Sequence, residues 1–132
     1  MSLVPPFPNH ISAVFEAYPD QARNVLYDLR EMVFGIASSI PEAGPVMETL
    51  KWGQPSYAVT TGTPVRLGVS KAGEPAVFVH CQTRVISDAR ALFDQGLCFE
   101  GNRAISFPSG CPIPETAVRH VLYTALSYRL KA

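Results

Sequence analysis

The longest pattern of apolar positions in the chain predicts a helix between residues 19 and 40. Its apolar side chains recur at helical spacing and form one continuous stripe: Val25, Leu26, Leu29, Met32, Val33, Ile36 and Ile40. Pro19 and Asp20 are typical of a first helical turn, and Pro41 ends the helix because it pushes the preceding residue out of the helical region. The chain therefore has a long amphipathic helix near its start.

Further helices are predicted on the same grounds. A short helix is expected to follow Asn9, a candidate N-cap, after an irregular segment over residues 1–9. Another spans residues 85–93, where apolar positions again recur at helical spacing, and Gly96 is placed to end it. The last is expected between Pro114 and Lys131, with a proline at its first turn and basic residues at its end.

The middle of the chain alternates between apolar and polar positions, which is typical of β-strands. Residues 65–70 alternate strictly and residues 76–81 are more uniformly apolar, with Gly73 in a turn between them, so these two strands predict a hairpin. Residues 103–107 predict a later strand. Two more strands are expected to meet at a break over residues 53–55, where glycine and proline interrupt the pattern.

The order of these elements predicts the fold class. Helices near both ends of the chain, with antiparallel strands between them, predict an α+β two-layer sandwich whose sheet of about five strands packs against the N- and C-terminal helices. No glycine-rich turn joins a strand to a helix, which argues against a dinucleotide-binding fold. We expect a single domain over residues 1–132, because no linker or repeat interrupts this order.

Composition narrows the expected partners. Hydrophobic residues make up 47% of the chain and charged residues 17%, which is typical of a globular protein. The 11 basic and 11 acidic side chains balance, so net charge gives no reason to expect nucleic acid or a membrane as partner. The first nine residues lack lysine and arginine, and no CxxC pair is present, so we expect a cytoplasmic protein.

Side chains that suit metal or nucleophilic chemistry are few. His80 and Cys81 are favoured metal ligands, but neighbours on a strand face opposite ways and do not easily share one ion. Cys81, Cys98 and Cys111 each lie in apolar or turn contexts that are typical of small buried thiols. The sequence therefore predicts no catalytic residue and no metal ligand.

The candidate binding site surrounds the single tryptophan. Trp52, Gln54, Ser56 and Tyr57 combine two aromatic rings with polar groups beside the Gly–Pro break, and such breaks often border a concavity. We expect this segment to form one wall of the principal cleft, with Gln54 and Tyr57 as the groups that touch a ligand. The alternative is that the two aromatic residues only pack strand ends against a helix.

The same segment carries a resemblance to a known family. Residues 48–57 read Glu-Thr-Leu-Lys-Trp-Gly-Gln-Pro-Ser-Tyr and resemble the Lys-Trp-Gly-x-Pro-x-Tyr hallmark of the DUF1801 or YdhG-like family. Residues 105–108, Ile-Ser-Phe-Pro, resemble its late strand, and the similarity extends over roughly residues 11–131. The resemblance implies an antiparallel sheet backed by helices. Because one branch is described as frataxin-like iron chaperones, it also implies iron as a candidate cargo.

Three functions stay open, in descending order: a module that binds a small molecule or a protein partner, an iron chaperone, and an enzyme of unrecognised type. Iron transfer needs several carboxylates displayed together, whereas only Asp28 and Glu31 stand at helical i,i+3 spacing. We therefore expect weak iron binding or none, and no other cofactor. The ligand is not identified by the sequence, and the oligomeric state stays open, with a homodimer among the alternatives.

Overall fold

Six antiparallel strands form one sheet in the computed structural model, which describes residues 4–93, 97–108 and 113–130. The strands are β1 (Met47–Lys51), β2 (Gln54–Ala58), β3 (Val65–Val69), β4 (Pro75–Phe78), β5 (Cys98–Glu100) and β6 (Ala104–Ser106). They lie in the order β1-β2-β3-β4-β6-β5, and every neighbouring pair is antiparallel. The predicted α+β class with an antiparallel sheet is confirmed.

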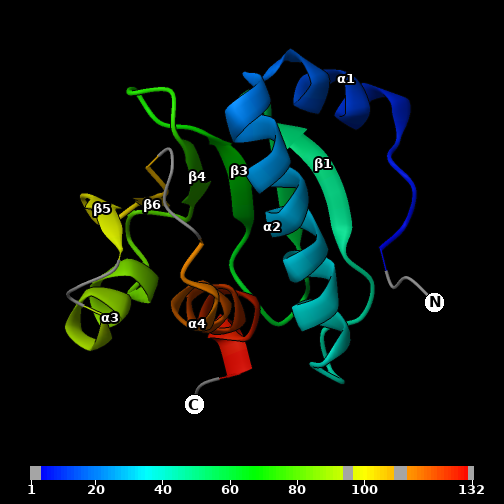
Figure 1. Ribbon diagram of the computed structural model, residues 1–132. Helices are drawn as coiled ribbons and strands as arrows, with labels where there is room; N and C mark the ends of the chain where they lie inside the picture. Colours follow the sequence, from blue (N-terminus) through cyan, green and yellow to red (C-terminus); the bar gives the residue numbers. More distant parts are fainter. Residues whose placement is uncertain (1–3, 94–96, 109–112, 131–132) are drawn as a thin grey trace.

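Four α-helices accompany the sheet in the described part of the chain. They are α1 (Asn9–Ala17), α2 (Asp20–Ser38), α3 (Val85–Leu92) and α4 (Glu115–Leu126), and α4 is followed by a short 3-10 helix, η1 (Tyr128–Leu130). In Figure 1, α2 and α4 lie in front of the sheet, and α1 lies beside the upper end of α2. None of these helices has both the length and the apolar character that crossing a membrane requires.

Most helix boundaries lie close to the predicted ones, and the end of the C-terminal helix differs most. Pro8 occupies the N-cap position of α1 and Pro19 that of α2, so Asn9 and Asp20 are the first helical residues. No side chain caps either start, because a proline stands at both cap positions. The C-terminal helix stops at Leu126 and continues as η1, and the Gly96 end of α3 lies outside the described residues.

The observed strands differ from the predicted ones at three places. The β1–β2 turn consists of residues 52–53, so Gln54 and Pro55 belong to β2, and Pro55 pairs with Leu50 in register. Strand β4 ends at Phe78, and residues 80–83 turn instead of continuing the strand. Strand β5 was not expected because its three residues are too few to show a period.

The hydrophobic core lies between one face of the sheet and the helices. Leu29 of α2, Leu67 of β3 and Leu122 of α4 are all fully buried in it, as the predicted apolar stripes require. Each of the four α-helices contributes buried apolar residues to this one cluster. On the other face of the sheet, here called the open face, the described residues form only a small separate cluster of Ala76, Phe78 and Ala104.

Candidate functional site

Trp52 stands at the most unusual backbone position of the described chain. It and Gly53 form the β1–β2 turn with φ values of 57° and 75°, and Trp52 is the one non-glycine residue there with positive φ. Positive φ at both positions defines a type I′ hairpin turn, which normally takes Asn-Gly. A bulky side chain in this left-handed region is strained by about 1–2 kcal/mol.

Burial of the Trp52 ring does not offset this strain. The ring is 90% exposed, more than any other large hydrophobic side chain of the described residues. Burial of apolar area is what normally stabilises a folded aromatic residue, and here almost none takes place. The protein therefore holds a strained, exposed tryptophan at the tip of a hairpin, which folding alone does not explain.

The residues of the predicted site separate onto the two faces of the sheet. Gln54 and Ser56 share the open face, because strand side chains alternate, and each lines a hollow together with Trp52. Tyr57 faces the helices and is fully buried. Trp52 and Tyr57 thus do not form one wall, and the structure brings together only three of the residues grouped by sequence.

Tyr57 belongs to a buried polar cluster instead. Its hydroxyl donates a hydrogen bond to Glu48 Oε2 at 2.8 Å, and Arg30 donates to both oxygens of Glu48 at 2.6 and 2.9 Å. Burial and then the Glu48 carboxylate raise the pKa of Tyr57. Burial alone would lower the pKa of Arg30, but Glu48 outweighs it and the pKa is raised. These shifts keep Tyr57 neutral and Arg30 charged at neutral pH.

Arg30 also ties the N-terminal segment to the domain. Its Nη2 donates to the carbonyl oxygen of Pro5 at 3.1 Å, and its Cζ lies 3.9 Å from the centroid of the Phe7 ring. The side chains of Arg30 and Glu48 are only 3% and 7% exposed. Because a buried charge is tolerated only when it is paired and hydrogen-bonded, this cluster has a structural role.

The larger of two hollows beside Trp52 on the open face has a volume of about 520 Å³ and is here called the Tyr128 hollow. Its lining combines cationic side chains, hydroxyl groups and the Trp52 ring: Lys51, Trp52, Ser56, Thr63, Pro64, Arg66, His80, Gln82, Thr83, Tyr128 and Arg129. No aspartate or glutamate is among these described lining residues. The hollow therefore offers an aromatic surface, hydrogen-bond donors and an excess of positive charge.

A smaller hollow of about 280 Å³, here called the Arg103 hollow, lies next to the Tyr128 hollow. It is lined by Trp52, Gln54, Arg66, Val69, Ser70, Lys71, Phe78, Glu100 and Arg103. Trp52 and Arg66 line both hollows, so they mark the boundary between them. Arg66 was not singled out in the sequence, although its polar position in the alternation of β3 was the signal that placed it opposite the core.

A backbone clasp brings Tyr128 and Arg129 to the Tyr128 hollow. Thr63 N–H donates to Ala125 O at 2.9 Å, Thr61 Oγ1 donates to Leu126 O at 2.8 Å, and Arg129 N–H donates to Thr61 O at 2.7 Å. Gly62 allows this approach, because a Cβ there would lie 2.4 Å from Ala125 O. No local sequence signal predicts this contact, since the segments are 65 positions apart.

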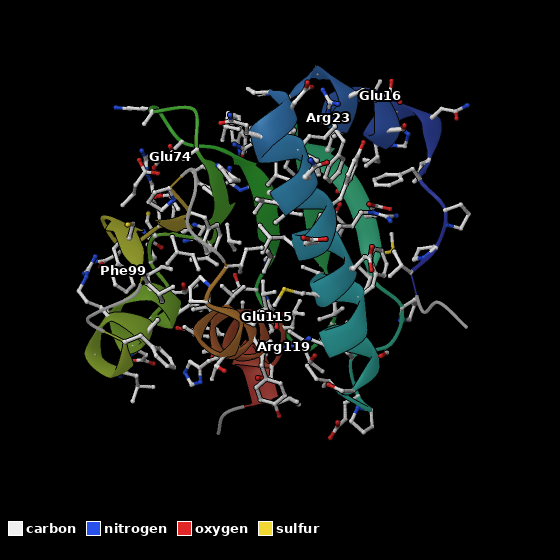
Figure 2. The ribbon with its side chains drawn as sticks, viewed as in Figure 1. Glu16, Arg23, Glu74, Phe99, Glu115 and Arg119 are labelled. Carbon is white, nitrogen blue, oxygen red and sulfur yellow. The ribbon has the colours of Figure 1, made fainter. Side chains whose placement is uncertain are left out.

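The remaining candidate groups lie elsewhere. Asp28 and Glu31 line a hollow of about 700 Å³ between α2 and α4, and Figure 2 shows Glu115 and Arg119 on the side of α4 that faces it. Cys81 and Cys98 are exposed free thiols, not the buried ones expected, and Cys111 lies outside the described residues. Within the described residues, no three histidine, cysteine or acidic side chains gather as a metal site would require.

The strand order and the covering helices define an α+β fold of the DUF1801 or YdhG type. The chain is similar to the crystal structure of a Bacillus subtilis protein of the DUF1801 family, YdhG, with a TM-score of 0.61 and 19% sequence identity over 94% of each chain. At this identity the similarity shows the fold alone, and it confirms the YdhG-like fold predicted from the sequence. No family model matches the chain, and no curated protein matches it.

Proposed function

We propose that the protein is a small-molecule-binding module and that its site is the Tyr128 hollow. Trp52 is the platform on which a planar part of the ligand stacks, and Ser56, Thr63 and Tyr128 are the hydroxyl groups that orient it. The observation that carries the proposal is the exposed Trp52 ring at positive φ on the rim of this hollow. Strained residues concentrate at functional sites, where binding offsets their cost.

The proposal keeps three residues of the predicted site and changes the role of the fourth. Trp52, Ser56 and Gln54 lie on the open face, and Gln54 supports the site from the adjoining hollow. Tyr57 acts from the opposite face by fixing β2 through its bond to Glu48. Neither iron transfer nor catalysis gains an observation in its favour, so binding is the one function proposed.

Fluorescence provides a direct test, because Trp52 is the only tryptophan in the chain. A screen of small metabolites with planar groups should yield compounds that quench or shift its emission and raise the unfolding midpoint through preferential binding to the folded state. A screen in which no compound changes the emission would contradict the proposal.

A pair of matched variants then locates the site by calorimetry. Trp52→Ala should weaken binding of a hit by about tenfold or more, because stacking on an aromatic side chain is worth roughly 1–3 kcal/mol. Tyr123→Ala is the control, since Tyr123 is an aromatic side chain on α4 that is 51% exposed and lies outside both hollows. Equal loss of affinity in both variants would place the ligand elsewhere.

A further inference from the structure

Arg66 has no ion-pair partner among the described residues. It is partly buried on β3, its Cζ lies 5.7 Å from the centroid of the Phe78 ring, and its Nη1 donates to Gln54 Oε1 at 3.1 Å. None of the ion pairs in the described chain includes Arg66 or Arg103. A partly desolvated guanidinium is thus satisfied by a neutral amide alone, although it has several further N–H donors.

The charged side chains around Arg66 are mostly cationic, and they repel its charge. Lys51 and Arg129 share the Tyr128 hollow with Arg66, while Lys71 and Arg103 share the Arg103 hollow. Glu100 is the one carboxylate among the described lining residues of the two hollows. Burial, followed by the charge of Arg103, lowers the pKa of Arg66. The folded protein therefore gathers cations that repel one another and that a bound anion would neutralise.

The position of the guanidinium is fixed by its neighbours. A Cβ at Gly68 would lie 2.6 Å from Gln54 Nε2, so the Gln54 side chain lies across β3 in space that only glycine leaves. Its Oε1 then holds Arg66 while the Phe78 ring supports the guanidinium from the side. A guanidinium held in this way needs little reordering before it binds a planar carboxylate or a phosphate with its remaining donors.

We propose that Arg66 is the anchor of an oxyanion site at the boundary of the two hollows. The ligand of the Tyr128 hollow is accordingly an anion that carries a phosphate or carboxylate group. Lys51 and Arg129 attract this anion from the Tyr128 hollow, and Arg103 attracts it from the Arg103 hollow. This inference rests on the proposed function, because it names the chemical class of the molecule bound in the same hollow.

The probes are inorganic pyrophosphate and citrate, titrated at constant ionic strength with Trp52 emission and the unfolding midpoint as readouts. Either anion should bind, and the stronger of the two identifies phosphate or carboxylate as the preferred group. Arg66→Gln should weaken that binding by about ten- to a hundredfold, the usual range for a lost charge-assisted hydrogen bond. Arg129→Gln, at an exposed position, should weaken it by a smaller factor and gives an answer if Arg66→Gln fails to fold.

The control is Arg119→Gln, which removes an exposed arginine on α4 beside Glu115 and outside both hollows (Figure 2). It should bind the anion as the unchanged protein does. Absence of binding by both anions, or equal affinity of the Arg66 and Arg119 variants, would overturn the inference. A short single-stranded oligonucleotide that binds more than about tenfold tighter than pyrophosphate would overturn it in favour of a nucleic-acid surface.

The outcomes also separate this inference from the proposed function. Neutral planar compounds that change Trp52 emission, without any binding of the anions, would support the function and refute the oxyanion site. Anion binding that depends on Arg66, without any planar compound changing Trp52 emission, would support the oxyanion site and refute the planar-ligand function.

Discussion

Arg30, buried on α2, and Arg66, partly buried on β3, lie on opposite sides of the same sheet, and their surroundings differ in one respect. Arg30 meets the Glu48 carboxylate with two nitrogen atoms and has a raised pKa. Arg66 meets only the amide of Gln54, and burial and Arg103 lower its pKa. The first charge is balanced within the molecule, whereas the second is not.

This difference separates residues that stabilise the fold from residues that reduce its stability. On the covered face, aromatic rings, a carboxylate and a phenol surround the charge and satisfy it. On the open face, a strained tryptophan stands beside unpaired cations. Binding sites commonly reduce stability, because groups that wait for a ligand are not satisfied by the protein itself.

Glu48→Gln provides the most severe test of the covered face. It keeps the size of the side chain but leaves Arg30 buried without its charge partner, so the free energy of unfolding should fall by about 3–5 kcal/mol in urea denaturation. Glu31→Gln, at an exposed position of α2, should stay within about 0.5 kcal/mol of the unchanged protein. A loss below about 1 kcal/mol for Glu48→Gln would show that Arg30 needs no counter-charge.

Tyr57→Phe tests whether the Tyr57 hydroxyl stabilises the fold, and a smaller loss of stability is expected than for Glu48→Gln. It removes one hydrogen bond to the buried Glu48, and the free energy of unfolding should fall by about 1–3 kcal/mol. Because the pKa of Tyr57 is raised in the folded state, the protein holds a proton that the unfolded chain releases above about pH 10. Stability should therefore decrease above that pH more steeply in the unchanged protein than in Tyr57→Phe.

Trp52→Asn has the smallest expected effect on stability, and it should stabilise the protein instead of destabilising it. Asparagine tolerates positive φ and forms the preferred Asn-Gly turn, so the variant should gain up to about 1 kcal/mol in free energy of unfolding while it loses ligand binding. Trp52→Ala is the control, because alanine removes the ring but keeps a Cβ in the left-handed region, and it should show no such gain. Destabilisation by Trp52→Asn would mean that the ring supports the fold.

The sequence predicted best where one periodicity ran without interruption. The stripe of α2 correctly buried Leu29, and the alternation of β3 placed Leu67 in the core. The β1–β2 segment is harder to predict, because Gly53 and Pro55 indicate a break, whereas Pro55 is paired within β2. The unbroken alternation of β2 would have placed Tyr57 opposite Gln54 and Ser56.

Two properties of the candidate site had no sequence signal. The net charge of zero describes the whole chain and says nothing about where its charges lie, so the cations around Arg66 were not foreseen. Tyr128 and Arg129 reach the hollow only because the clasp at Gly62 joins distant segments. Both properties depend on tertiary contacts that no local pattern encodes.

The clasp has a consequence for motion as well as for position. Since Thr63 and Arg129 donate their N–H groups across it and Thr61 its hydroxyl, the end of α4 cannot separate from the loop before β3 unless all three bonds open. Amide hydrogen exchange at these two residues should therefore report one shared opening event. A ligand held between Trp52 and Tyr128 should slow both exchange rates by the same factor.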